Sequence, residues 1–326
     1  MSRVVRFHHP VLIDLMREMN NPIKFSVTVP AYKAQFLKEC IDSILAQTYQ
    51  NFELIIVNDA SPQDLDSIVA QYHDPRIRYY KNKVGFGAEH VVGNWNKCLE
   101  YATGDYLICM GDDDKLLPNC LEEYVKLMGQ YPDLDLYHTM TEIVDEKDNI
   151  TGIQEPRPLW ESVYSIIYWR WKSRHQQYIG DWLFKIKTLR KEGGFYDLPY
   201  AWGSDDLSAA VAAIDKGVAN TQQPGFQYRK SGQTISSDNS NAIQKIESIR
   251  RIYDFYANFL KKVPEERLDK LYYKLLKESF QNERLKALAW NIGADLKNHP
   301  QHILTMWLHG KVDHKTLLRS VIYTLR

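Results

Sequence analysis

The feature that most constrains the fold is a strand and helix alternation that fills the first third of the chain. Apolar runs typical of buried strands occur at Phe25–Val29, Phe52–Val57, Ile77–Tyr80 and Tyr106–Met110. Helical periodicity separates these runs, with apolar residues recurring at i, i+4, i+7 and i+8 in the segment that starts at Leu37. Alternation of this kind is typical of a mostly parallel sheet with helices on both faces. We therefore expect an α/β fold.

Polar clusters directly follow three of the predicted strands. They are Pro30-Ala31-Tyr32, Asn58-Asp59 and Asp112-Asp113-Asp114. In open α/β sheets the ligand crevice lies outside the carboxyl ends of the strands. The three clusters therefore predict a binding site at one edge of the sheet.

The composition excludes several classes of protein. The 41 basic residues are balanced by 41 acidic ones, so net charge gives no argument for nucleic-acid binding, and we expect none. The four cysteines form no C-x-x-C pair, which argues against a disulfide scaffold or a zinc site. No apolar run reaches the roughly 18 residues that span a bilayer. Asp14, Arg17 and Glu18 interrupt the N-terminal apolar stretch, so we interpret it as a helix and expect a cytoplasmic protein.

Three acidic groups are candidates for chemistry, and each has a structural alternative. Asp112 to Asp114 would repel one another unless a cation is present, which suggests a Mg²⁺ or Mn²⁺ phosphate site, although charge runs are commonly solvated turns. Asp59 could accept hydrogen bonds from a base or ribose, or it could cap a turn. Asp205 or Asp206 could supply a general base, or both could complement a helix dipole. The residues alone do not choose between Asp205 and Asp206 as the base. The motif Gly85-Phe86-Gly87 lacks the third glycine of a dinucleotide fingerprint and is interpreted as a loop that enters a helix.

Taken in order, these clusters resemble the family 2 glycosyltransferases with the GT-A fold. Val27 to Tyr32 is similar to the V-x-V-P-x-Y-N opening of that family, and Glu53 to Ser61 is similar to E-L-I-I-V-D-D-G-S. Further along, Asp113 to Pro118 resembles D-D-x-x-x-P, Gly193 to Phe195 resembles G-G-F, and Ser204-Asp205 resembles the E-D element. The resemblance covers residues 25–235 and includes Cys40 to Tyr49, which is similar to S-I-L-x-Q-T-Y/F.

The resemblance implies a role for each matching residue. Asp205 is the expected catalytic base, and Asp113 is the expected ligand of Mn²⁺ or Mg²⁺. Binding of the nucleotide sugar is expected from Pro30, Tyr32, Asp59, Asp112 and Asp114, and from His90 by its position alone. Asp206, Lys83 and Arg229 are further candidates. Three positions depart from the family pattern: Asn58 stands where Asp is frequent, Gly111 where the first Asp of the metal motif is usual, and Ser204 where Glu is common.

The implied protein is an inverting, metal-dependent glycosyltransferase. It would transfer one hexosyl or N-acetylhexosaminyl group from a UDP-sugar to a saccharide or lipid-linked acceptor in the assembly of a cell-surface polysaccharide such as capsule, lipopolysaccharide or exopolysaccharide. No Q-x-x-R-W element of the processive synthases occurs. Alternatives are a non-catalytic nucleotide-sugar-binding protein on the same fold and a sugar-nucleotidyltransferase. We expect an N-terminal helical segment over 1–24, the GT-A domain over 25–235, and a C-terminal helical region over 236–326.

The last 26 residues carry basic side chains interleaved with apolar ones. Lys311, Lys315, Arg319 and Arg326 face a single acid, Asp313, and Trp307, Leu318 and Val321 lie among them. A basic helix with an apolar face can lie in a membrane interface. The alternatives are packing on the catalytic domain and a contact in a homodimer, because apolar stripes at helical spacing are usually core. The sequence therefore predicts either peripheral contact at the inner face of the membrane or an intramolecular or dimer interface.

Overall fold

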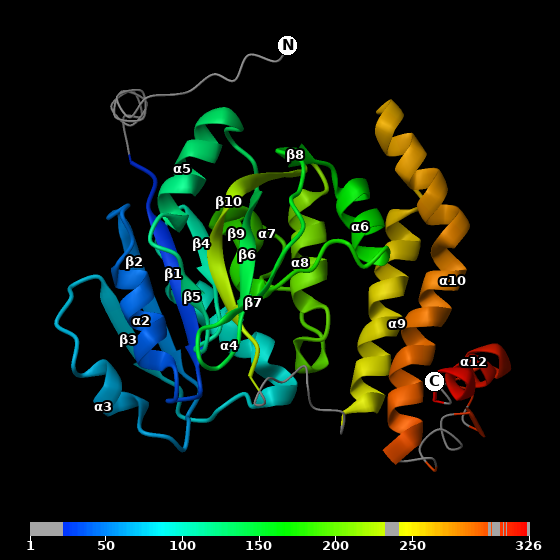
Figure 1. The fold of residues 1–326 in the computed structure, drawn as a ribbon, viewed down its shortest axis with the longest axis horizontal. Coiled ribbons are helices and arrows are strands. Elements are labelled where there is room, and N and C mark those ends of the chain that lie inside the picture. Colours follow the sequence, from blue (N-terminus) through cyan, green and yellow to red (C-terminus); the bar gives the residue numbers. More distant parts are fainter. Residues whose placement is uncertain are drawn as a thin grey trace.

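The computed structural model describes residues 22–231, 241–298, 301, 307–308, 310 and 312–324. The predicted helix before residue 22 lies outside the described residues. A single curled sheet forms the centre of the molecule, with helices on both of its faces (Figure 1). Its strands are β1 Phe25–Ala31, β2 Phe52–Asn58, β3 Ile77–Lys81, β4 Tyr106–Cys109, β5 Lys115–Leu116, β6 Leu136–Val144, β7 Ile150–Ile153, β8 Trp160–Glu161, β9 Trp182–Lys185 and β10 Val218–Arg229.

The sheet order is β3-β2-β1-β4-β9-β6-β10-β5, with β7 on β6 and β8 on β10. Strands β3, β2, β1 and β4 pair in parallel, as the alternation predicts. Strand β9 runs antiparallel to both β4 and β6, and β10 is parallel to β6. Six strands therefore share one direction, and this confirms a mostly parallel central sheet.

Helices flank the sheet and continue beyond it on one side (Figure 1). They are α2 Leu37–Leu45, α3 Leu65–Val69, α4 Val91–Tyr101, α5 Cys120–Gln130, α6 Val163–Trp171, α7 Ile186–Lys191, α8 Ser204–Ala213, α9 Ala242–Phe259, α10 Arg267–Asn298 and α12 His314–Thr324. Short 3-10 turns lie at η1 Ala88–His90, η2 Ile179–Asp181 and η3 Pro199–Ala201. Among the described residues, none of the helices combines the length and apolar character needed to cross a bilayer.

Side-chain alternation along the strands divides the core into two apolar layers. Leu54 and Ile56 of β2 pack with α2 and α5 on one face, while Ile55 and Val57 pack with α4 on the other. The second layer also contains Tyr253 and Tyr256 of α9 and Leu276 of α10. The C-terminal helices therefore share a continuous core with the sheet.

Two expected elements differ from the observed structure. From the sequence, the run Ile179 to Ile186 predicts a single strand, whereas the structure divides it into η2, the short strand β9 and the start of α7. The segment from Trp160 to Arg174 is rich in tyrosine and tryptophan, and from the sequence we expect a variable loop of the acceptor pocket here, but the structure shows that it is mostly the helix α6. Seven of the nine residues in α6 are apolar, and the helix is buried on most sides, so it lacks the one-sided pattern that identifies a surface helix.

Candidate active site

The polar clusters at the ends of β1, β2 and β4 lie around one cavity. These strands are adjacent and parallel, so their carboxyl ends meet at one edge of the sheet. The cavity has a volume of about 770 Å³. Of the predicted site residues, eight line it: Pro30, Tyr32, Asp59, Asp112, Asp113, Asp114, Asp205 and Asp206. Three do not: His90, Lys83 and Arg229.

Asp112 connects the ends of β4 and β1. Its Oδ2 accepts hydrogen bonds from the backbone N–H groups of Tyr32 and Lys33, both at 2.6 Å. Burial raises the pKa of Asp112 to about 6, because desolvation and the charge of Asp113 outweigh the attraction of Lys33. This carboxylate therefore fixes the turn that presents Tyr32 to the cavity.

Asp113 forms an ion pair with Lys33, a residue that the sequence interpretation did not single out. The Lys33 Nζ lies 2.7 Å from Oδ2 of Asp113. Burial disfavours the charged form of Lys33, but the neighbouring charges of Asp113 and Asp112 outweigh this effect and raise its pKa. The ammonium group of Lys33 therefore contacts Asp113, the predicted metal ligand, in this structure. Motif spacing could not reveal this pairing, because the partners are 80 residues apart.

Arg229 of β10 holds Asp114 in place by hydrogen bonding. The Arg229 backbone N–H donates to Oδ1 of Asp114 at 2.9 Å, and its Nε donates to the Asp113 carbonyl at 2.9 Å. The Arg229 guanidinium lies 4.1 Å from the centre of the Phe36 ring, and the residue is only 1% exposed. Arg229 therefore supports the acidic turn rather than facing the cavity. Burial, with the charge of Asp113, raises the pKa of Asp114.

Gly111 has a steric reason to depart from the family pattern. A Cβ at this position would lie 2.8 Å from Oδ1 of Asp113 and 2.9 Å from Oδ2 of Asp114. Any side chain here would force these two carboxylates to move. The arrangement of Asp113 and Asp114 thus depends on glycine at position 111.

Asp59 holds the loop that contains the G-x-G motif. Its carboxylate accepts hydrogen bonds from the backbone N–H groups of Phe86 at 2.9 Å and Gly87 at 3.1 Å, and from the Asn82 side chain at 2.9 Å. Residues 83 to 90 are exposed, which places Lys83 and His90 on the outside of this loop. Lys83 and His90, which were predicted from their positions alone, therefore lie outside the cavity lining.

Asp205 and Asp206 lie in the first turn of helix α8, which begins at Ser204 directly after Gly203, a residue with a φ of +84°. Asp206 is paired with Arg170 of α6, whose Nε donates to Oδ1 at 3.0 Å and to Oδ2 at 2.9 Å. Asp205 has no cationic partner of its own among the described residues. Its pKa is raised to about 8 by burial and by the charge of Asp206, against the opposing charge of Arg170. The two carboxylates that the sequence left equivalent are therefore distinct.

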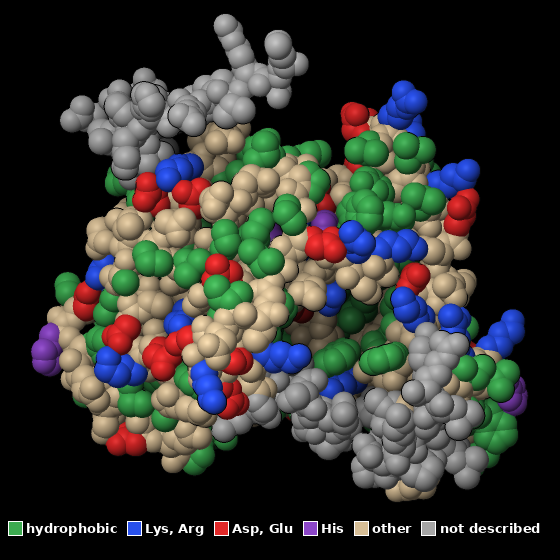
Figure 2. Space-filling view, in the orientation of Figure 1, with side chains coloured by type: hydrophobic (Ala, Val, Ile, Leu, Met, Phe, Trp, Pro, Cys, Tyr) green, Lys and Arg blue, Asp and Glu red, His purple; other side chains and the backbone are tan. Residues whose placement is uncertain are grey.

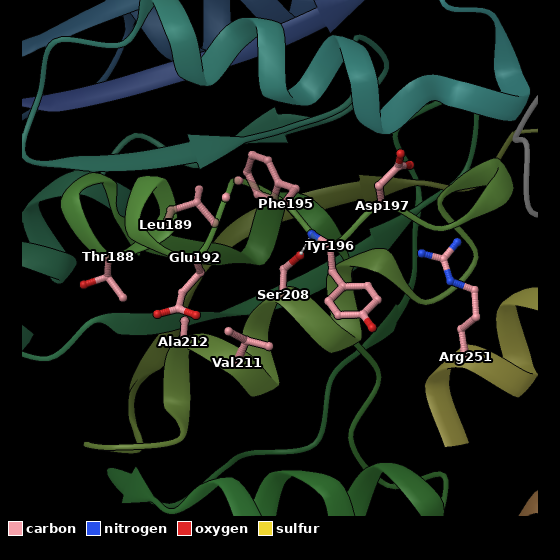
Figure 3. Close-up of a pocket in the computed structure, with 12 residues that line it drawn as sticks. Thr188, Leu189, Glu192, Phe195, Tyr196, Asp197, Ser208, Val211, Ala212 and Arg251 are labelled. Carbon is pink, nitrogen blue, oxygen red and sulfur yellow. Dashed lines mark hydrogen bonds between the residues drawn. The ribbon is translucent and has the colours of Figure 1, made fainter. Parts of the chain in front are cut away.

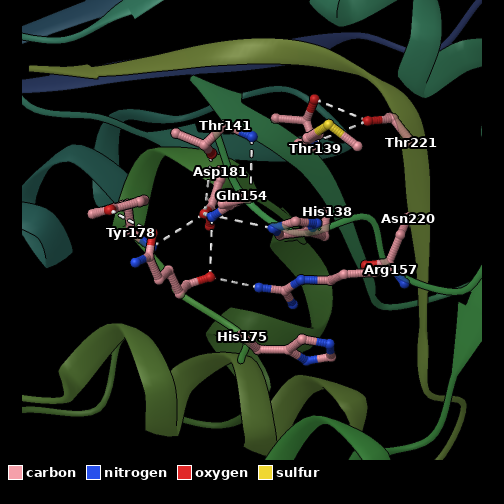
Figure 4. Close-up of polar contacts among 12 residues, drawn as sticks. His138, Thr139, Thr141, Gln154, Arg157, His175, Tyr178, Asp181, Asn220 and Thr221 are labelled. Atoms are coloured by element: carbon pink, nitrogen blue, oxygen red, sulfur yellow. Dashed lines mark hydrogen bonds and ion pairs between the residues drawn. The ribbon is translucent and has the colours of Figure 1, made fainter. Parts of the chain in front are cut away.

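A buried polar network around Asp181 contacts the segment that carries Tyr178 (Figure 4). Oδ2 of Asp181 accepts from the Gln154 side chain at 2.7 Å and from the Tyr178 backbone N–H at 3.2 Å. Arg157 donates to the Gln176 carbonyl at 2.7 Å. Burial raises the pKa of Asp181 to about 7. The network fixes the backbone of this cavity wall, and no sequence motif pointed to it.

The G-G-F turn lines a second, smaller cavity of about 350 Å³ (Figure 3). Its lining includes Gly194, Phe195 and Arg251, and it shares no lining residue with the larger cavity. The Phe195 ring lies 5.7 Å from the ring of Trp95, which lines the larger cavity. The turn therefore supports the wall of the larger cavity from outside.

The comparisons with known proteins identify the family. The model of glycosyl transferase family 2 matches residues 26–188, which is half of the chain, and the chain belongs to this family. Three relatives are named as glycosyltransferases. EpsE of Bacillus subtilis is 34% identical over 132 residues, 39% of this chain and 46% of its own. WcaA of Escherichia coli, named for colanic acid biosynthesis, is 37% identical over 109 residues, 32% of this chain and 38% of its own.

A third relative, a glycosyltransferase of Rickettsia typhi, is 31% identical over 133 residues, 40% of each chain. The match thus spans less than half of the length of these three relatives. Among solved structures, S. aureus TarS residues 1–349 in complex with UDP-GlcNAc superposes with a TM-score of 0.60 at 18% identity, covering 83% of this chain and 81% of TarS. This similarity establishes the fold, which is that of the GT-A glycosyltransferases.

Proposed function

We propose that the protein transfers a single sugar from a UDP-sugar to a hydroxyl group of a saccharide or lipid-linked acceptor, with inversion at the anomeric carbon. The observation that carries the proposal is that Asp112 to Asp114 and the Asp205–Asp206 pair line the same cavity. TarS, which shares the fold, is known in complex with UDP-GlcNAc and with UDP. WcaA, named for colanic acid biosynthesis, supports a role in polysaccharide assembly.

The proposal includes a divalent cation at Asp113, where it would take the place that the Lys33 ammonium group holds in this structure. Six carboxylates line the cavity, against the cations Lys33 and Arg170, so a diphosphate would be repelled unless further positive charge enters with it. The described residues contain no group of three or more His, Cys, Asp and Glu side chains arranged to hold a metal by themselves. Mg²⁺ is commonly held by one or two carboxylates together with substrate phosphates, and Asp113 would supply the carboxylate here. A bound cation would act as a Lewis acid toward the leaving phosphate.

The chemistry assigned to this chain is proton removal and orientation. Asp205 takes the proton of the acceptor hydroxyl as its oxygen bonds to the anomeric carbon and the bond from that carbon to the UDP oxygen breaks. Asp206 is paired with Arg170, and its charge raises the pKa of Asp205 and so makes that carboxylate a stronger base. One carboxylate suffices for inversion, since a retaining double displacement needs a second, nucleophilic carboxylate at the anomeric carbon.

The proposal also includes peripheral membrane contact through the C-terminal helices. Leu268, Leu271 and Leu275 of α10 are 42% to 61% exposed, and Leu318 of α12 is 67% exposed. In the space-filling view, apolar side chains lie beside Lys and Arg side chains over the upper part of α10 (Figure 2). Exposed apolar side chains next to basic ones are typical of helices that bind at a lipid interface. The same surface would serve a homodimer.

A panel of UDP-sugars tests the proposed function. Release of UDP with Mn²⁺ present should occur for at least one UDP-hexose or UDP-N-acetylhexosamine, and Asp113→Ala should abolish it. The non-catalytic alternative predicts UDP binding without release. Absence of both binding and release for the whole panel would overturn the proposal.

A further inference from the structure

The cavity continues past the acidic turns to an apolar wall near Asp205. We define the acceptor wall as Tyr200, Trp202 and Ile252, all of which line the cavity. These residues lie beyond position 188, where the family match ends, whereas the residues at the ends of β1, β2 and β4 lie within it. The acceptor wall is thus built by residues outside the matched region, whereas the acidic turn after β4 lies within it.

Helix α9 holds Trp202 in place. The Nζ of Lys245, a residue only 4% exposed, lies 4.3 Å from the centre of a Trp202 ring. A Cβ at Gly203 would collide with the Ile252 side chain, so α9 packs directly against the turn that begins α8. An indole ring fixed in this way is a rigid surface at one side of the cavity.

The turn that carries Tyr200 is strained. Tyr200 has a φ of +56° and Ala201 a φ of +52°, values in the left-handed region that residues other than glycine rarely adopt. Strained backbone of this kind persists only where the surroundings impose it, and it gathers at ligand sites. Here the turn contacts α9 and η1, and Tyr200 lines the same cavity as Asp205, the proposed base.

Gln177 adds an unpaired polar group to the same cavity. Its side chain is 93% buried, and neither Oε1 nor Nε2 has a hydrogen-bond partner among the described residues. Leaving a buried amide unpaired costs free energy, so a ligand that pairs with it gains affinity. An amide offers one acceptor and two donor hydrogens, which complements the hydroxyl groups of a sugar.

We propose that the acceptor wall and Gln177 form an acceptor subsite for an uncharged saccharide, which rests on and extends the proposed function. The C–H face of the sugar ring packs on Trp202, a second hydroxyl pairs with Gln177, and the reacting hydroxyl lies at Asp205. Flat aromatic faces beside hydrogen-bonding groups suit a ring that is apolar on its faces and polar at its rim. At this end the two carboxylates of Asp205 and Asp206 outnumber the single cation Arg170, which disfavours an anionic sugar.

Saturation-transfer NMR on the full chain tests the subsite. The probes are methyl glucoside, methyl galactoside and methyl N-acetylglucosaminide, each added with UDP and Mn²⁺ present. The wild type should transfer saturation to at least one glycoside, and Trp202→Ala should weaken this signal at least tenfold. Trp290→Ala is the matched control, because Trp290 lies on α10 at 65% exposure and is not part of the cavity lining.

Tyr200→Gly is the second variant. Glycine suits a φ of +56°, so this change removes the ring while relieving strain, and it should also weaken the glycoside signal. UDP affinity should stay within twofold in every variant. Unchanged glycoside signals in both wall variants, or no glycoside signal in a wild type that binds UDP, would overturn the subsite. A wild type that fails to bind UDP would instead contradict the proposed function.

Discussion

Replacing Asp205 by asparagine isolates the base from the rest of the cavity. The change keeps the size of the side chain, so the wall stays filled while the carboxylate can no longer take a proton. Loss of a general base lowers turnover by roughly 10²- to 10⁴-fold, or about 3 to 5 kcal/mol in activation free energy. UDP affinity should be nearly unchanged, because we assign donor binding to the acidic turn after β4.

Asp206→Asn is the matched control. Asp206 acts through Arg170, and the pair is partly exposed, with side-chain exposures of 38% for Arg170 and 15% for Asp206. Removing the Asp206 charge lowers the pKa of Asp205, so the rise of turnover should move to lower pH, while turnover at pH 9 should fall far less than in Asp205→Asn. The assay is the rate of UDP release at saturating donor and acceptor, with UDP affinity from calorimetry. If Asp206→Asn lost more turnover than Asp205→Asn, the assignment of the base would be refuted.

The pH profile gives an independent test of the same residue. A base acts when deprotonated, and burial together with Asp206 raises the pKa of Asp205 to about 8. Turnover should therefore rise with pH between 7 and 9 by about tenfold, as the ionised fraction grows from roughly one tenth to nine tenths. A profile that is flat over this interval would contradict the role of Asp205.

Three further predictions concern the surroundings of the cavity. Arg170→Met removes the cation that favours ionised Asp205, so the rise of turnover should move to higher pH; a shift to lower pH in the same rate assay would contradict the ion-pair account. Gly194→Ala should lower the free energy of unfolding by about 1–3 kcal/mol in urea, and by more than Gly193→Ala, because both glycines have positive φ but only a Cβ at Gly194 would displace the Asn96 side chain. Equal losses would refute that contact. The full chain should co-sediment with anionic liposomes, and deletion of 301–326, which removes the exposed Leu318, Val321 and Ile322 of α12, should weaken this without aggregation; a truncated chain that aggregates would favour packing instead.

The sequence predicted the parallel half of the fold because its strands are apolar on both faces. Runs such as Phe52–Val57 are distinctive, and the polar residues after them mark the carboxyl edge of the sheet. The other half was harder to predict, because β9 is a four-residue strand between a 3-10 turn and a helix, and it pairs with β4 across more than 70 residues. Long-range antiparallel pairing leaves no local periodicity.

The sequence predicted the carboxylates of the candidate site, but it did not predict the cations that pair with them. Lys33 and Arg170 pair with Asp113 and Asp206 across 80 and 36 residues, so no motif contains both partners. Arg229 was named from the sequence, but it supports the acidic turn from the core. His90 was named by position beside a glycine-rich loop, and the hydrogen bonds of that loop to Asp59 leave it outside the cavity lining.

Calorimetric titration with UDP, with and without Mn²⁺, tests the central claim that the acidic turn after β4 binds a nucleotide diphosphate together with a cation at Asp113. The wild type should bind UDP with Mn²⁺ present and at least tenfold more weakly with EDTA. Asp113→Ala should abolish this difference, while Asp66→Ala, a change at an exposed carboxylate outside the cavity lining, should preserve it. UDP binding that is equally tight in EDTA, or in Asp113→Ala, would contradict the account.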